Sequence, residues 1–232
     1  MEQKNTEPEN FSQPENIKND LKTELQPKPK KAHDDHQEHR GLRSVASTVA
    51  ILLSSLAIAL ILARFVFQRI DVVGNSMFPN IHNKDVIIVN KFPVTKSEIE
   101  HKQYLPKRGD IIVFESPLDY GSAKDKNIIK RVIALPGERV TLKDGKFTVY
   151  NSEHPNGFDP DSAYKDTLPY TDGQVDNLTV PEGHIFVSGD NRTSGESLDS
   201  RNSLGTVPID NIIGEAWLRV YPFDRASNFY KN

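Results

Sequence analysis

The sequence predicts a mainly β protein, in which an antiparallel β-rich domain follows a single transmembrane helix and a disordered N-terminal tail. The first observation is a polar, proline-containing start, and the second is an uncharged apolar run of about 20 residues that follows it. The third is a series of short β-branched segments bounded by Gly, Pro or Asp. We place the tail at residues 1–42, the transmembrane helix at 43–67 and the β domain at 68–232.

The tail is polar and contains almost no large apolar residues. Such a segment buries too little surface to offset the entropy lost on ordering, so we expect it to be disordered. His33, His36 and His39 recur at every third position within it. They form either a weak metal-binding tract or a solvated low-complexity stretch, and we favour the solvated stretch.

The apolar run extends from Ser44 to Ala63 without a charged side chain. As a helix, about 20 residues rise about 30 Å, which matches the hydrocarbon thickness of a bilayer. A buried core helix is rarely apolar on every side over such a length. A cleaved signal peptide is disfavoured, because the preceding tail is long and Arg64 follows the run directly. We therefore expect a retained membrane anchor, followed by an interfacial collar of Phe65, Phe67 and Arg69.

The basic residues around the span predict its orientation. Those that closely precede it are Lys28, Lys30, Lys31, Arg40 and Arg43, whereas Arg64, Arg69 and Lys84 follow it. Cytoplasmic flanks of membrane spans carry an excess of Lys and Arg. We therefore expect a single-pass protein of the cell membrane with a cytoplasmic N-terminus and an extracytoplasmic β domain.

The β domain is predicted from short runs rich in β-branched residues. Asp144-Gly145 supplies the positive φ angles of a tight hairpin turn between two of these runs. We see no long helical period after the span, and we expect residues 151–177 to form a long excursion from the core. The predicted strands are 86–89, 111–114, 128–135, 140–142, 147–150, 185–187 and 216–221, with a further strand-like segment at 70–73.

Charge and composition exclude several kinds of function. The chain has 232 residues, a net charge of −3 and no cysteine. Nothing in this charge points to a nucleic-acid partner. Without cysteine there is no disulfide framework, no thiolate metal site and no cysteine nucleophile. No His-Glu-x-x-His motif is present to bind zinc, and we expect neither a metal nor a cofactor.

Ser76 is a candidate nucleophile in a tight turn. Gly74 permits close backbone approach before it, and Pro79 stiffens the chain after it. The motif is not a Gly-x-Ser-x-Gly elbow, because Phe78 stands at the second glycine position. A turn serine is commonplace, and a serine nucleophile needs a base nearby.

Lys130 is the candidate base. The alternation of a strand places Lys130 on the same face as Ile128, Val132 and Ala134. Burial among aliphatic side chains lowers the pKa of a lysine, and a neutral amine can accept a serine proton. The alternative is a lysine whose stem packs while its head group stays in water. Arg131, on the opposite face, is expected to pair with a carboxylate.

A third cluster comprises Gly189-Asp190-Asn191-Arg192 and Ser197-Leu198-Asp199-Ser200-Arg201. It is rich in small, hydrogen-bonding and charged residues directly after a strand. Such a run is either a surface loop held by Asx turns and ion pairs or a set of residues that orients a catalytic group. Its composition alone does not decide between the two.

These segments resemble a known family when they are taken in order. Asn75-Ser76-Met77-x-Pro79 is followed by Arg108-Gly109-Asp110-Ile111-Ile112-Val113-Phe114, by Lys130-Arg131-Val132-Ile133-Ala134-Leu135-Pro136-Gly137-Glu138, and by the third cluster. The ordered set resembles the bacterial type I signal peptidases, or leader peptidases, which use a Ser-Lys dyad. The resemblance covers nearly all of residues 65–221 and includes the preceding anchor.

The resemblance implies roles for individual residues. Ser76 would be the nucleophile and Lys130 the general base, while the hydroxyl of Ser197 would help to position the lysine amine. The charged residues that support the site would be Asp199, Arg131 and Arg201, and Met77 and Pro79 would shape the substrate cleft. The implied fold is a β-rich domain with an apolar surface close to the membrane.

Two departures from the family pattern affect the site. Some members have a serine that donates to the oxyanion two positions before the nucleophile, where this chain has Gly74. The oxyanion would then depend on backbone N–H groups, chiefly that of Ser76. The spacing from Arg192 to Asp199 is also longer than usual, so either Ser197 or Ser194 fills the hydroxyl role. The short insert without cysteine resembles the Gram-positive form.

The expected function is that of a membrane-bound serine endopeptidase, which removes signal peptides from secretory preproteins by cleaving after A-x-A-like small residues. We expect contact with membrane lipid, no nucleic acid and a monomer. A self-cleaving repressor-type Ser-Lys protein is one alternative, although a membrane span stands where those proteins carry a helix-turn-helix. The other is an anchored β module that binds exported proteins without cleaving them.

Overall fold

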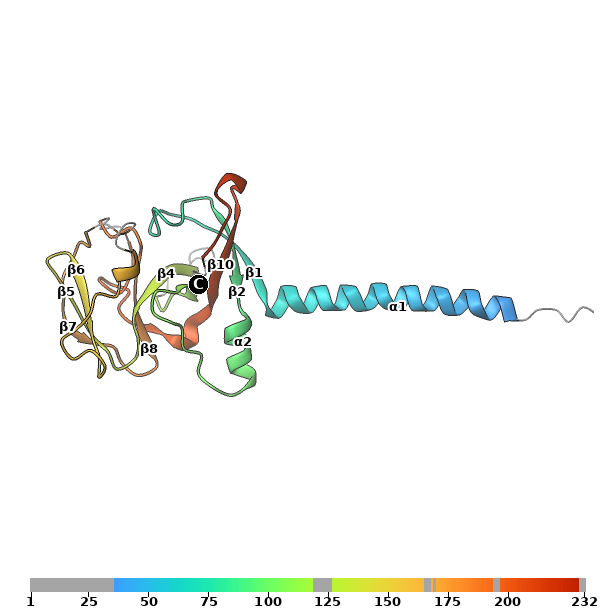
Figure 1. The fold of residues 1–232 in the computed structure, drawn as a ribbon, viewed down its shortest axis with the longest axis horizontal. Helices are drawn as coiled ribbons and strands as arrows, with labels where there is room; N and C mark the ends of the chain where they lie inside the picture. Colours follow the sequence, from blue (N-terminus) through green and yellow to red (C-terminus); the bar gives the residue numbers. More distant parts are fainter. Residues whose placement is uncertain (1–35, 119–126, 165–167, 169, 194–196, 230–232) are drawn as a thin grey trace, which may run out of the picture. The chain divides into compact units, whose positions relative to one another are not determined.

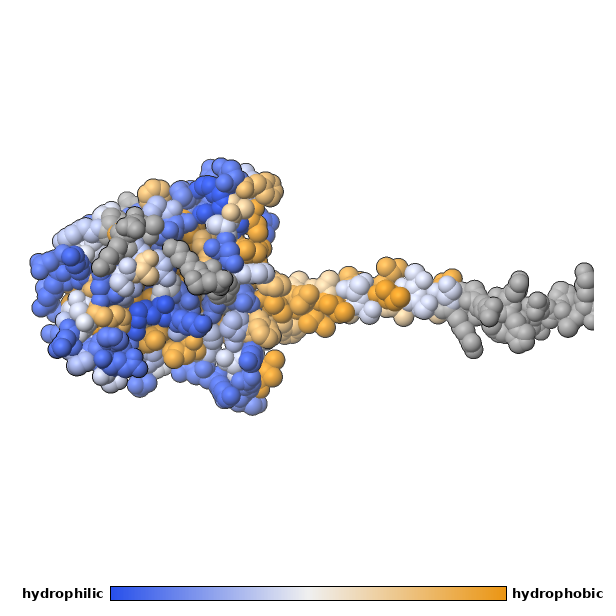
Figure 2. Space-filling view, viewed as in Figure 1, coloured by the Kyte–Doolittle hydropathy of each residue, from blue (hydrophilic) through white to orange (hydrophobic). Residues whose placement is uncertain are grey.

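The computed structural model describes residues 36–118, 127–164, 168, 170–193 and 197–229. Helix α1, His36–Phe65, contains the apolar run, and its segment Ser44–Phe65 is long and apolar enough to cross a membrane. The side chains of this segment are exposed, and Figure 2 shows apolar residues along it. Most of the predicted tail lies outside the described residues, while α1 begins before the predicted start of the span.

The larger sheet is antiparallel throughout and has the strand order β1-β2-β10-β3-β4-β8-β9, with β11 paired to β10. The prediction of a mainly antiparallel β domain after one apolar helix is confirmed. The strands are β1 Phe67–Asp71, β2 Val86–Asn90, β3 Ile111–Glu115, β4 Asn127–Ala134, β8 His184–Ser188, β9 Val207–Pro208, β10 Ile212–Tyr221 and β11 Ser227–Asn228.

The smaller sheet has the order β6-β5-β7, with β5 Arg139–Lys143, β6 Lys146–Tyr150 and β7 Val175–Thr179. Figure 1 shows it beyond β4 and β8, on the side away from β1 and β2. The hairpin between β5 and β6 turns at Asp144 and Gly145, whose φ angles are 50° and 73°. The hairpin predicted from Asp-Gly is confirmed.

Several elements differ from the sequence-based expectations. Phe67 and Arg69, predicted as an interfacial collar, belong to strand β1, because α1 ends at Phe65 and the following residues pair with β2. The predicted excursion 151–177 pairs with β6 through Phe158 and ends in β7. The elements without a prediction are α2 Phe92–Ile99, β7, β9, β11, and the 3-10 helices Ser162–Tyr164, Ile209–Asn211 and Phe223–Arg225.

The core positions the site because strand β3 is buried on both faces. Ile112 and Phe114 pack into one apolar cluster, and Ile111 and Val113 into another. Ile112 lies opposite Lys130 in the β3–β4 ladder, so Lys130 sits inside the sheet rather than at its end. Ile128 and Val132 contact the same cluster as Ile112, in agreement with the predicted face of β4. A register shift after Val132 places Ala134 in the cluster under the smaller sheet.

Candidate active site

The segment that carries Ser76 connects β1 to β2 and is fixed by apolar anchors. The side chains of Met77 and Ile81 are buried in the core beside Val72. Main-chain hydrogen bonds run from Phe78 N to the Asn75 carbonyl (3.0 Å) and from Ile81 N to the Met77 carbonyl (2.8 Å). These contacts hold the backbone of the serine turn, residues 74–81, and leave Ser76 half-buried at its surface.

Lys130 lies in direct contact with Ser76. Its Nζ donates to Ser76 Oγ at 2.7 Å and to the Ile129 carbonyl at 3.0 Å. The side chain is buried, with 3% of the residue exposed. The alternative of a lysine with its head group in water is therefore wrong for this residue.

Burial lowers the pKa of Lys130 from 10.5 to about 8. Loss of hydration disfavours the ammonium form, and the Asp199 and Asp190 carboxylates oppose this effect because they attract the positive charge. The neutral amine is thus accessible near neutral pH. A neutral amine that contacts a serine hydroxyl can accept its proton.

Arg131 forms a buried two-point ion pair with Asp190. Its Nε donates to Oδ1 at 2.7 Å and its Nη2 to Oδ2 at 2.6 Å, while Nη1 donates to the Gly109 carbonyl at 2.7 Å. The guanidinium lies 4.2 Å from the ring centre of Tyr164. The expected pairing of Arg131 with a carboxylate is confirmed, and the pair joins the strand of Lys130 to the loop after β8.

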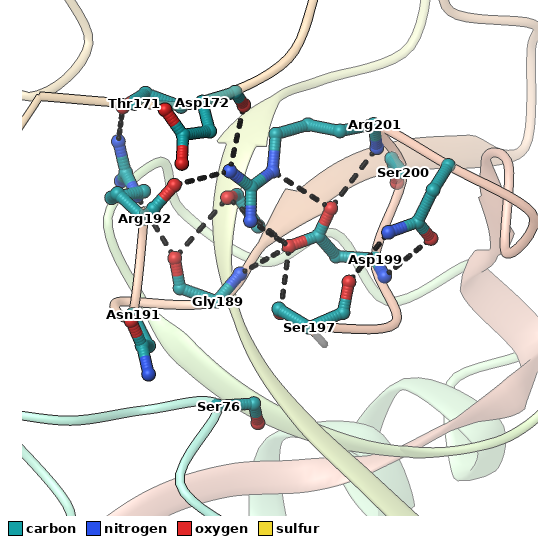
Figure 3. A network of polar contacts seen from close by, with 12 residues as sticks. Ser76, Thr171, Asp172, Gly189, Asn191, Arg192, Ser197, Asp199, Ser200 and Arg201 are labelled. Carbon is teal, nitrogen blue, oxygen red and sulfur yellow. Dashed lines mark hydrogen bonds and ion pairs between the residues drawn. The ribbon is translucent and has the colours of Figure 1, made fainter. Parts of the chain in front are cut away.

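Asp199 is the centre of a second buried network. Its carboxylate accepts from Gly189 N (2.9 Å), Ser197 Oγ (2.9 Å), and Arg201 Nε and Nη2 (3.0 and 2.8 Å). Burial alone would raise the pKa of this carboxyl, but the hydrogen bonds and charge of Arg201 hold it below the ordinary value. Figure 3 shows the network, with Ser76 on the side of Gly189 and Ser197.

Ser197 donates to Asp199, and the structure records no bond between its hydroxyl and Lys130. It nevertheless lies at the site, because a Cβ added to Gly189 would meet Ser76 O at 2.4 Å and Ser197 Oγ at 2.5 Å. Ser194 lies outside the described residues. The role of either hydroxyl toward the lysine remains a prediction.

Sequence reasoning did not assign a role to Arg192, although it lies within the third cluster. Its guanidinium is fully buried and bonds the Asp161 carboxylate, the Gly189 carbonyl (2.9 Å) and Thr171 Oγ1 (3.2 Å). A buried arginine needs an acidic partner. The sequence offers many acids, and nothing local marks Asp161 as the partner.

A groove of about 880 Å³ has Ser76 and Lys130 in its lining. It lies between the chain from β1 to the serine turn and the first half of β4. Its lining residues are Gln68–Ser76, Val113, Asn127–Lys130, Asn191 and Leu198. Met77 packs into the core instead, and neither Met77 nor Pro79 belongs to this lining. Among the described residues, no group of three His, Asp or Glu side chains is placed to hold a metal ion.

The site pairs a serine with a buried lysine beside a groove, on an antiparallel β domain that follows an apolar helix. This arrangement is the one expected of serine hydrolases in which lysine takes the place of histidine. The family model described as signal peptidase, peptidase S26, matches residues 45–221. The chain belongs to this family, and it is a serine peptidase that removes signal peptides.

The sequences of two relatives agree with this membership. Signal peptidase I P of Bacillus subtilis subsp. natto is 31% identical over 82% of this chain and 96% of its own length. Signal peptidase I T of Bacillus subtilis (strain 168) is 32% identical over 77% and 84%. A crystal structure of a signal peptidase I from Enterococcus faecalis V583 aligns with 47% of this chain and 95% of its own at 31% identity, with a TM-score of 0.36. The repressor-type and binding-module alternatives are set aside.

Proposed function

We propose that Ser76 is the nucleophile and Lys130 the general base in the cleavage of secretory preproteins after small, A-x-A-like residues. The observation that carries this proposal is the 2.7 Å contact from the Lys130 amine, itself 3% exposed, to the Ser76 hydroxyl. Neutral Lys130 takes the proton of Ser76 as the oxygen attacks the scissile carbonyl. The ammonium then protonates the leaving amine, and the same amine activates the water that hydrolyses the acyl-enzyme.

The N–H group of Ser76 is assigned the role of donating a hydrogen bond to the developing oxyanion. The carbonyl of Asn75 accepts from Phe78 N (3.0 Å) and from Asn191 Nδ2 (3.2 Å). In a trans peptide the C=O and N–H groups point in opposite directions, so these bonds fix the direction of the Ser76 N–H. A donor that is oriented before the reaction stabilises the transition state without further reorganisation.

The groove suits an extended peptide. β1 pairs only with β2 among the described strands, and residues Asn127–Lys130 of β4 pair only with β3. Both walls of the groove therefore present main-chain groups that lie outside the β ladders, although the Ile129 carbonyl already accepts from Lys130 Nζ. A substrate strand can add to such an edge through backbone hydrogen bonds, which do not depend on sequence. Side-chain selection is then left to the positions next to Ser76.

The anchor places the reaction near the bilayer. Ser76 follows the end of the span at Phe65 by 11 residues, which reach at most about 40 Å when fully extended. Signal peptides of preproteins occupy the same bilayer. The excess of basic residues before the span supports a cytoplasmic N-terminus and an extracytoplasmic peptidase domain.

The test compares variants of the full-length protein, purified in detergent, on a preprotein with an A-x-A site. Ser76→Ala and Lys130→Ala should each lower kcat at least about 1,000-fold. The matched controls are Ser152→Ala and Lys146→Ala, which remove exposed side chains of the same types, and they should retain wild-type rates. Full activity of either site variant would reject the dyad, and cleavage elsewhere in the preprotein would reject the assigned specificity.

A further inference from the structure

A single buried carboxylate joins the two halves of the proposed dyad. Asp190 is fully buried, and besides its two bonds from Arg131 it accepts a hydrogen bond from Asn80 Nδ2 at 2.8 Å. Asn80 belongs to the serine turn, and Arg131 follows Lys130 directly on β4. The connection from the serine to the lysine therefore runs through one carboxylate with a partner on each side.

Asn80 is also held through its main chain. Its carbonyl accepts from Arg219 Nη1 of β10 at 2.7 Å. Arg219 in turn contacts Asp85, a fully buried carboxylate, at 3.2 Å, and Arg225 contacts the same carboxylate at 3.1 Å. Asn80 thus connects two ion-pair clusters, the Arg131–Asp190 pair through its side-chain amide and the Arg219–Asp85 pair through its main-chain carbonyl.

The chemistry at this position favours asparagine. A carboxylate that already receives two hydrogen bonds from an arginine can accept a further one, and the amide group of asparagine supplies a neutral donor. Aspartate at the same place would be an acceptor facing an acceptor, with two negative charges in contact. Alanine would leave the Asp190 oxygen with the arginine alone.

We propose that Asn80 is a positioning residue, which sets the separation between Ser76 Oγ and Lys130 Nζ by tying the serine turn to Asp190. It acts through Asp190 and Arg131 and is not itself a reacting group. The inference rests on the proposed dyad and deepens it.

The remaining contacts bound the size of the effect. Without the Asn80 bond, the turn keeps the hydrogen bond from Asn191 N to the Ser76 carbonyl (2.9 Å) and the buried side chain of Met77. The turn should therefore shift rather than unfold. A displacement of about 1 Å at reacting atoms can lower the rate about 100-fold. We expect Asn80→Ala to lower kcat about 10- to 100-fold and to change KM less than about threefold.

The experiment measures kcat, KM and the pH dependence of kcat for full-length Asn80→Ala, Asn80→Asp and Asn80→Ser on the A-x-A preprotein, with thermal unfolding in the same detergent. The matched control is Asn211→Ala, which removes a comparable side-chain bond (3.0 Å, to the Glu115 carbonyl) away from the site. The control should keep the wild-type kcat. Asn80→Ser retains a shorter donor and should lie between wild type and Asn80→Ala.

Asn80→Asp supplies a readout that a merely structural role would not move. Its added negative charge beside Asp190 should raise the midpoint of the kcat profile, because Asp190 and Asp199 already favour the ammonium form of Lys130. A kcat within twofold of wild type for Asn80→Ala, or an unchanged midpoint for Asn80→Asp, overturns the inference. If Asn80→Ala does not fold, a wild-type kcat for Asn80→Ser overturns the inference instead. Loss of activity in Ser76→Ala and Lys130→Ala tests the dyad separately, so a failure of this inference can be distinguished from a failure of the dyad.

Discussion

The pH dependence of cleavage provides a quantitative test of Lys130 as the base. With its pKa lowered from 10.5 to about 8, roughly a tenth of the molecules carry the neutral amine at pH 7. A lysine with the ordinary pKa would be neutral in about three molecules in ten thousand. Burial among the strands therefore raises the reactive population roughly 300-fold at this pH.

The expected profile follows from the sign of this shift. Since the base acts in its neutral form, kcat/KM should rise about tenfold from pH 6 to pH 7 and level off above about pH 8. The assay is the initial rate at substrate concentrations below KM, from pH 6 to pH 9.5 at constant ionic strength, with the full-length protein in detergent. Under these conditions kcat/KM reports the free enzyme. Lys146→Ala should give the same midpoint as wild type.

A different profile would refute the reasoning. A midpoint near 6.5 would indicate a histidine as the base. A profile without a rising limb would show that no group with the lowered pKa of Lys130 controls the reaction. Either result would leave the family membership intact and remove Lys130 from the proposed role.

Two further predictions concern stability and packing. Lys130→Met should abolish cleavage yet raise the free energy of unfolding at pH 7 by up to about 3 kcal/mol, because the wild type keeps a mostly charged amine in a buried place. This gain in stability should shrink above pH 8, where wild-type Lys130 loses its proton on folding. Denaturant unfolding in detergent at pH 7 and pH 10 would measure the difference. Gly189→Ala should lower kcat/KM about 100-fold, because its Cβ would meet Ser76 O and Ser197 Oγ. The control Gly205→Ala has nothing within 4 Å of its Cβ; its φ of 65° makes alanine costly to stability, but the folded variant should keep kcat/KM. Equal rates in the two folded variants would contradict the packing described.

The strands that could be predicted from the sequence are those with a local signal. β3 and β4 are β-branched runs, and Asp144-Gly145 predicts the hairpin turn in which it lies. Helix α2 escaped prediction because it has only eight residues and includes Pro93 in its first turn, so it shows no helical period. β1 was predicted only in part, by the strand-like segment 70–73, because its first residues follow α1 almost directly and read as part of the membrane collar.

The residues of the candidate site likewise fall into those with a local sequence signal and those without one. Ser76 and Lys130 stand in recognisable local contexts, and Arg131 was expected to find an acid. The identity of that acid, Asp190, and the pairing of Arg192 with Asp161 join residues 59 and 31 positions apart. Local patterns do not encode such pairings, because any exposed carboxylate of the chain would satisfy the same rule.

The segment predicted as an excursion has a consequence for local opening of the domain. Phe158 exchanges two main-chain hydrogen bonds with Val149, Thr171 N donates to the Gly145 carbonyl, and Asp172 N donates to the Arg192 carbonyl. These amides are released to solvent only when contacts with the smaller sheet and with the loop after β8 are broken. Phe158, Thr171 and Asp172 therefore belong to the same cooperative unit as the loop that supports the dyad. Their amides should exchange with deuterium as slowly as those of that loop, and breaking these contacts should disturb catalysis rather than alter a free surface loop.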